Sequence, residues 1–98
     1  MSCRLFLKRA ATSDLDEAVA WYEAQKPGLG LRLLGEATDL LERIQRAPLE
    51  FPIVHKAIRR GLLNRFPYGV FFLLNDESIS VLAITHLRRD PRVWRSRK

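Results

Sequence analysis

The sequence is poor in the residues that build disulfide frameworks and metal centres. Its one cysteine, Cys3, has no partner for an internal disulfide, and His55 and His86 are the only imidazoles that could join it around a metal ion. A zinc site usually needs four nitrogen or sulfur ligands, so neither a zinc site nor a disulfide-rich fold is expected. A lone free thiol suits a reducing compartment. We therefore expect no metal and no other cofactor.

Long apolar runs are also missing. The apolar stretch 5–7 is too short for the core of a signal peptide, and no run approaches the roughly 20 residues that a membrane-spanning helix needs. The 98 residues suffice for one domain, and 47% hydrophobic and 29% charged residues are ordinary for a globular chain. We expect a single cytoplasmic domain over residues 1–98 with no membrane partner.

Acidic residues are scarce in the second half of the chain, so the charge distribution is strongly asymmetric. Residues 1–54 carry 7 Lys+Arg and 8 Asp+Glu, whereas residues 55–65 carry four basic residues and no acid. Residues 86–98 carry six basic residues and one acid, Asp90. These two segments hold all of the excess behind the net charge of +6. Such a surplus favours a partner rich in phosphate or carboxylate, and a solubilising surface explains it equally well.

Apolar periodicity predicts two helices after a short strand at residues 4–8. Thr12-Ser13-Asp14 offers a helix N-cap with acids in the first turn, and Pro27-Gly28 ends this first helix. A second helix is expected from about Leu29 to Arg46, in a hairpin with the first, because the connection between them is very short. Its apolar face is predicted to comprise Leu34, Ala37, Leu41 and Ile44, widened by Leu33 and Leu40.

The pattern changes to strands after Pro52. Residues 57–63 are typical of a strand with a bulge at Gly61, and the apolar runs 70–74 and 79–85 flank a polar turn, which predicts a β-hairpin. Because these runs are apolar on consecutive residues, both sheet faces should be covered, and the two helices can cover only one. The other face needs the tail, a second subunit or a bound partner.

The sequence therefore predicts an α+β fold in the order β-α-α-β-β-β. An N-terminal helical hairpin packs on a small, mainly antiparallel sheet, followed by a basic C-terminal tail.

An ordered set of short motifs runs along most of the chain. They are Asp14-Leu-x-Glu17-Ala…Trp21-Tyr-Glu, Pro27-Gly-Leu-Gly30, Pro48…Phe51-Pro, Arg59-Arg60…Arg65-Phe66-Pro67-Tyr68 and His86-x-x-Arg89-x-Pro91…Trp94-x-x-Arg97. Over about residues 4 to 97 this set resembles the ParE/RelE superfamily, the toxins of bacterial type II toxin–antitoxin systems. The resemblance implies the same order of elements and a small cognate antitoxin that wraps the toxin.

The RelE-like branch cleaves messenger RNA in the ribosome without a metal. The resemblance places its roles at a basic residue on the second strand, an Arg after the third-strand aromatic, an Arg after the fourth strand and a Tyr six residues later. Arg60 and Arg88 match the first and third of these positions. Gly69 follows the aromatic Tyr68, and Trp94 replaces the final Tyr, so an indole stands where that branch has a titratable hydroxyl.

His86 would be the natural general acid or base of such a nuclease, because imidazole readily exchanges protons near neutral pH. A structural, hydrogen-bonded histidine is the other interpretation. The catalytic set of a nuclease would then comprise Arg60, Arg65, His86, Arg88 and Trp94.

The ParE-like branch is thought to inhibit DNA gyrase by binding, with no chemical step in the toxin. The turn at residues 27–30 and the block at residues 59–68 look more like this branch. A toxin that binds an essential target such as gyrase is therefore favoured over a ribosome-dependent endonuclease, a stand-alone nucleic-acid-binding module or a chain that has lost toxicity. The expected target-binding residues are Arg59, Arg60, Arg65, Arg88, Arg89, Arg92, Trp94, Arg95 and Arg97.

Two of these positions admit specific structural interpretations. Arg59 and Arg60 are neighbours on a strand and should point to opposite sheet faces. Trp94 stands among arginines, as do aromatic residues that stack on bases, but it can equally pin the tail against the sheet.

Overall fold

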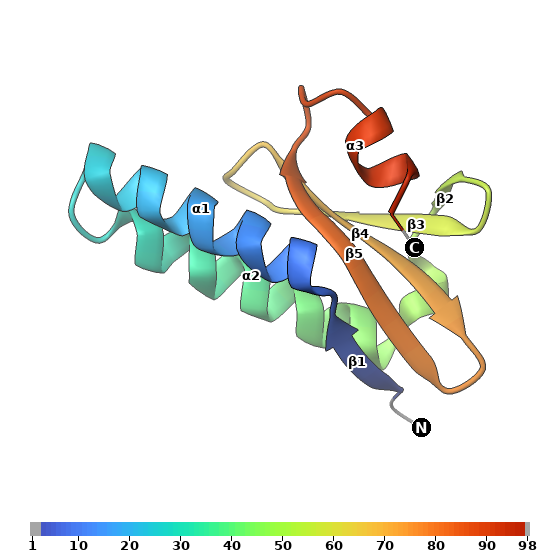
Figure 1. Ribbon diagram of the computed structural model, residues 1–98. Helices are drawn as coiled ribbons and strands as arrows, with labels where there is room; N and C mark the ends of the chain where they lie inside the picture. The colour runs from blue at the N-terminus through green and yellow to red at the C-terminus, as the bar shows by residue number, and fades with distance from the viewer. Residues whose placement is uncertain (1–2, 98) are drawn as a thin grey trace.

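The computed structural model describes residues 3–97 and places two long helices against a five-stranded sheet (Figure 1). The predicted α+β class and its order of elements are confirmed. The strand β2 and the helix α3 are additions that the sequence patterns did not reveal. The elements are β1 (Arg4–Leu7), α1 (Arg9–Gln25), α2 (Leu29–Arg46), the short 3₁₀ helix η1 (Pro48–Glu50), β2 (Ile53–His55), β3 (Ile58–Leu62), β4 (Tyr68–Asn75), β5 (Ser78–His86) and α3 (Arg92–Arg95).

The sheet has the strand order β1-β5-β4-β3-β2. Among the described strands the β1–β5 pair alone is parallel; the other pairs are antiparallel, as predicted for a mainly antiparallel sheet. The β4–β5 hairpin closes at the pair Asn75 and Ser78. β1 pairs with β5 only as far as Val81, so among residues 3–97 no strand lies beside the second half of β5 on that side.

The helical hairpin of α1 and α2 covers one face of the sheet (Figure 1). From α2 the buried residues Leu33, Ala37, Leu40 and Ile44 pack on the sheet, at the i, i+4, i+7, i+11 spacing of a helical face. The predicted face of α2 was wrong at Leu34, which is 39% exposed. The core stripe is therefore centred one position earlier than expected.

Gly61 does not form the predicted bulge. It pairs with Val70 in regular register, and the bulges of the sheet lie between Ile53 and His55 and between Phe71 and Phe72. A Cβ atom at Gly61 would lie 3.1 Å from side-chain atoms of both Leu40 and Phe51. The missing side chain therefore allows α2 and the segment after η1 to pack closely on the sheet.

The predicted N-cap of α1 was also wrong. The helix begins at Arg9 with Lys8 as its N-cap residue, makes no side-chain capping bond and has no acid in its first turn. The chain enters the helix directly from β1, since the Lys8 N–H donates to the Val81 carbonyl. Asp14 thus lies in the second turn, where its carboxylate has a different role.

Trp94 of α3 covers the second face of the sheet. Its ring stacks on Phe71 with centroids 4.2 Å apart and planes 15° apart, and the residue is 7% exposed. Ile58, Leu82 and Ala83 complete this second cluster. The tail, one of the three covers expected for this face, lies over it. Trp94 fixes the tail to the sheet, in agreement with one of the two interpretations of this residue.

Asp14 joins α1, β5 and the tail. Its carboxylate, on a residue only 8% exposed, accepts the Ile84 N–H at 3.1 Å and a hydrogen bond from the Arg97 guanidinium. Arg97 also donates to the Leu82 carbonyl at 3.1 Å. We call this arrangement the Asp14–Arg97 clamp.

Replacing Trp94 by Ala should destabilise the fold by about 3–5 kcal/mol, because the change removes a buried aromatic side chain and uncovers Phe71, on which that side chain stacks. Equilibrium unfolding in urea measures this loss. Trp94→Phe preserves a stacked ring and serves as the control, with a loss of about 1 kcal/mol. A loss below about 1 kcal/mol for Trp94→Ala would mean that α3 is not held by this ring.

Replacing Asp14 by Ala should cost about 3 kcal/mol, because it leaves the Arg97 guanidinium and the Ile84 N–H without their acceptor. Asp16 is exposed on the same helix, so Asp16→Ala is the matched control and should change stability by less than about 0.5 kcal/mol. Thermal and urea unfolding of the two variants give the comparison. Equal losses in both would contradict the role of the clamp.

Candidate functional site

The two neighbouring arginines of β3 lie on opposite faces of the sheet, as alternation predicts. Arg59 shares the helix-covered face with Gly61 and donates to the Phe51 carbonyl at 2.7 Å. Arg60 pairs with Phe71 on the face covered by α3. Its Nε atom is buried and has no hydrogen-bond partner among residues 3–97.

Arg65 and Arg88 come from loops that meet at one end of the sheet. Arg65 lies in the loop between β3 and β4, Arg88 in the turn after β5, and the Leu87 N–H joins the two loops by donating to the Pro67 carbonyl at 2.8 Å. Both arginines are exposed. The two basic segments of the sequence therefore meet at these loops.

The arginines of the C-terminal segment divide into exposed and engaged residues. Arg92 is exposed and its hydrogen bond, 2.6 Å long, holds the pKa of the Asp90 carboxyl below its usual range. The Arg95 guanidinium lies over the Trp94 ring, 5.5 Å from its centroid. Arg97 is engaged in the clamp, and Lys98 lies outside the described residues. We call the exposed set, comprising Arg65, Arg88, Arg89, Arg92 and Arg95, the arginine surface.

The structure does not gather the residues of a nuclease around one point. His86 packs edge-on against Tyr68, with ring centroids 5.4 Å apart, and its Nδ1 accepts the Arg88 N–H at 3.1 Å. It lies beside α1, whereas Arg60 and Trp94 belong to the face covered by α3. The sheet thus separates the candidate proton-transfer group from two other members of the set.

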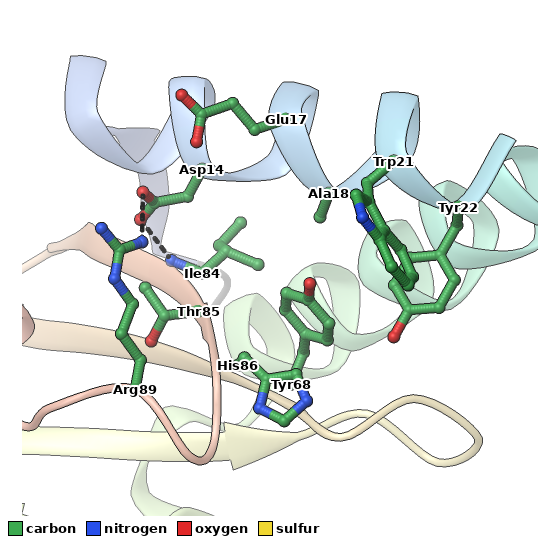
Figure 2. Close-up of a pocket in the computed structure, with 10 residues that line it drawn as sticks. All are labelled: Asp14, Glu17, Ala18, Trp21, Tyr22, Tyr68, Ile84, Thr85, His86 and Arg89. Carbon is green, nitrogen blue, oxygen red and sulfur yellow. Dashed lines mark hydrogen bonds and ion pairs between the residues drawn. The ribbon is translucent and has the colours of Figure 1, made fainter. Parts of the chain in front are cut away.

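A pocket of about 450 Å³ lies between α1 and the second half of β5 (Figure 2). One wall of the pocket is a row of rings in contact with one another. The ring centroids of Trp21 and Tyr22 are 4.9 Å apart, those of Tyr22 and Tyr68 are 6.0 Å apart, and Tyr68 packs against His86. Trp21 is 57% exposed at the rim. The lining residues are Asp14, Glu17, Ala18, Trp21, Tyr22, Tyr68, Ile84, Thr85, His86 and Arg89.

Sequence reasoning missed this pocket. The adjacent pair Trp21-Tyr22 lies roughly 100° apart on the helix, which predicts one ring in the core and one partly exposed ring, as an antitoxin contact or in helix–helix packing. Nothing local shows that the second half of β5 borders a pocket. The structure shows which ring is exposed: Trp21, one helical turn after the buried Ala18.

The pocket is polar at one end. Arg89 is 48% exposed in its side chain and its Nη1 atom lies 4.0 Å from Asp14 Oδ1. Burial raises the pKa of the Tyr68 hydroxyl, and the neighbouring Tyr22 raises it further, so Tyr68 stays protonated at neutral pH and can donate a hydrogen bond.

Neither a metal cluster nor a membrane span is found in residues 3–97. No three His, Cys, Asp or Glu side chains in this range are placed to hold a metal ion together. None of the described helices is both long and apolar enough to cross a bilayer.

Comparison with known proteins agrees with this fold. Residues 5–91 match the model of a family described as the ParE toxin of type II toxin-antitoxin system, parDE. The chain is 33% identical over 92 residues to Toxin ParE2 of Mycobacterium tuberculosis, strains CDC 1551 and H37Rv, covering 93% of this chain and 88% of the relative.

Two solved structures share the fold. The chromosomal ParDE system of P. aeruginosa superposes with a TM-score of 0.77 at 21% identity, covering 87% of this chain and 96% of that one. The toxin–antitoxin complex RelBE2 of Mycobacterium tuberculosis gives 0.64 at 16% identity, covering 88% and 99%. With the match over residues 5–91 and the 33% identical relative, these findings agree with the resemblance seen in the motifs, and the chain belongs to the ParE toxin family of type II toxin–antitoxin systems.

Proposed function

We propose that this chain is a toxin that inhibits growth by binding an essential target, such as DNA gyrase, and that a cognate antitoxin neutralises it. The observation that carries the binding mechanism is the position of Trp94. Its ring is buried on Phe71, on the sheet face opposite to the one that His86 faces.

Cleavage of RNA without a metal makes strict demands on geometry. The 2′-hydroxyl attacks the adjacent phosphate, so a base, an acid and cationic charge have to surround one phosphate within hydrogen-bond reach. In this chain Arg60 and His86 lie on opposite sheet faces, and position 69 is a glycine without charge. A binding inhibitor needs no such convergence.

The arginine surface is the part of the molecule that suits target binding. Its guanidinium groups are exposed on the loops at one end of the sheet and on α3, and a cluster of one sign of charge steers an acidic partner toward it. Arg59 and Arg97 act indirectly in this proposal, because their hydrogen bonds to Phe51 and Asp14 fix the backbone beneath the surface. Trp94 has the same supporting role.

The antitoxin is proposed from two considerations. The relatives with the same fold are named as toxin–antitoxin systems, one of them as a complex. The exposed arginines of this chain also suit an acidic segment of a small protein. We expect that protein to be encoded beside this chain.

The purified chain should inhibit DNA supercoiling by gyrase and leave ribosome-bound messenger RNA intact, because its nuclease positions do not converge. Supercoiling assays with excess chain and primer extension on translating ribosomes test the two mechanisms side by side. Addition of the neighbouring gene product should restore supercoiling. Site-specific RNA cleavage with unaffected gyrase would refute the binding mechanism and identify a ribonuclease.

Reversing the charge of two residues of the arginine surface should weaken toxicity without unfolding the protein. In the double variant Arg65→Glu/Arg88→Glu the concentration for half-maximal inhibition of the target should rise about tenfold or more, since opposed charges slow encounter and weaken the complex. Arg32→Glu/Arg46→Glu changes the same charge at exposed positions of α2 and is the control. Equal toxicity of both double variants would show that the arginine surface is not the contact.

A further inference from the structure

Two exposed leucines lie among the residues of the arginine surface. Leu62 is the last residue of β3, just before the loop that carries Arg65, and it is 48% exposed. Leu87 directly follows β5, next to Arg88, and it is 43% exposed. A single exposed leucine is ordinary on a protein surface, whereas leucines that lie side by side form an apolar patch.

Gly69 of β4 brings the two leucines together. Its register partner on β3 is Leu62, so the Leu62 side chain stands beside the bare backbone of Gly69 on the same sheet face. From the side of β5, Leu87 reaches over the glycine: a Cβ atom at position 69 would lie 3.2 Å from Leu87 Cδ2 and 3.1 Å from Phe71 Cε1. Phe71 belongs to the face covered by α3, so the leucines lie at the margin of that face. We call Leu62, Gly69 and Leu87 the leucine patch.

Hydrogen bonds hold both loops that border the leucine patch. Glu36 of α2 accepts the N–H groups of Asn64 and Arg65 through its Oε1 atom, at 2.9 and 3.0 Å. On the other loop, the Leu87 N–H donates to the Pro67 carbonyl at 2.8 Å. Loops that are already fixed lose little conformational entropy when a partner binds, so this surface is preorganised for a contact.

Exposed arginines border the leucine patch on both loops. The one acid among residues 86–98, Asp90, is already bonded to Arg92 at 2.6 Å. Arg65 and Arg88 keep their guanidinium groups exposed. An apolar centre with a charged rim is the usual anatomy of a protein–protein interface, and the positive sign of this rim selects an acidic partner. A nucleic-acid backbone would engage the arginines and leave the leucines against water.

We propose that the leucine patch is the apolar centre of the target-binding surface and takes an apolar side chain from an acidic surface of a target protein. That side chain packs between Leu62 and Leu87 over Gly69, and neighbouring carboxylates of the target pair with Arg65 and Arg88. The existence of a target rests on the proposed function, whereas its contact point and its chemical class rest on the leucine patch.

Removal of both leucine side chains should weaken the toxin. Leu62→Ala/Leu87→Ala should raise the chain concentration for half-maximal inhibition of purified gyrase about tenfold or more, because central apolar contacts dominate the affinity of an interface. Leu31→Ala/Leu49→Ala, at leucines of α2 and η1 that are 68% and 72% exposed, is the matched control and should leave inhibition unchanged. Leu62→Met/Leu87→Met keeps the apolar surface and should retain most of the inhibition, which separates a lost contact from a lost fold.

Salt separates the apolar contact from the charges around it. Calorimetry of gyrase binding between about 0.1 and 0.5 M salt should show a shrinking loss for Arg65→Glu/Arg88→Glu, because salt screens exposed charges. The loss for Leu62→Ala/Leu87→Ala should persist over the same range. The affinity for a DNA duplex, measured in parallel, should be the same for this leucine variant and the unchanged chain.

Growth of cells that express each variant without the antitoxin separates the patch from the function. Full toxicity of Leu62→Ala/Leu87→Ala would refute the leucine patch and leave the proposed function intact. Lost toxicity of this variant, with no gyrase binding by the unchanged chain, would support the patch and replace gyrase by another protein. An unchanged chain that is neither toxic nor bound to gyrase would refute the proposed function and the target together. A leucine variant that loses only DNA affinity, antitoxin affinity or self-association would assign the patch to that partner and overturn the target assignment.

Discussion

The buried carboxylate of Asp14 is the contact on which the arrangement of the C-terminal half depends. A charged group in a protein interior is tolerated when donors surround it, and here the Ile84 N–H and the Arg97 guanidinium do so. The same contact fastens the last residues of the described chain to α1 and brings α3 over the sheet. Trp94 can then stack on Phe71, and the neighbouring arginines are held on a fixed surface.

The fold could be predicted where the signal is local. The hairpin of β4 and β5 and the extent of α2 follow from apolar runs, a polar turn and a proline, and the structure agrees at each. Predictions failed where a distant contact decides. Asp14 has the sequence context of an N-cap, but the two groups that donate hydrogen bonds to its carboxylate lie 70 and 83 positions away, in β5 and the tail. Gly61 likewise has the sequence context of a bulge, but a glycine stands there because Leu40 packs too closely to leave room for a side chain.

In the candidate site, too, local features could be predicted from the sequence and features that depend on distant contacts could not. The concentration of positive charge in two segments is visible in the sequence, but which arginines are available depends on tertiary contacts. Arg97 lies only two residues after the exposed Arg95, and yet it is hydrogen-bonded to the buried Asp14 carboxylate. Arg59 is likewise hydrogen-bonded to the carbonyl of the buried Phe51. The pocket beside α1 was not predictable. The short first strand is visible in the sequence, but its pairing with only the first half of β5 is a tertiary feature, which leaves the second half of β5 without a neighbouring strand on that side among residues 3–97.

Arg89 lies where the arginine surface meets the pocket beside α1. It belongs to the exposed arginines and also lines that pocket, where its Nη1 atom lies 4.0 Å from Asp14 Oδ1. The clamp acts at the same place on the backbone of β5, because Asp14 accepts the Ile84 N–H and Arg97 donates to the Leu82 carbonyl. These two groups lie beyond the residues of β5 that pair with β1, so side chains there satisfy backbone groups that a neighbouring strand would otherwise have to satisfy. One pair of side chains therefore both fastens the tail and completes the hydrogen bonding of this part of the sheet edge.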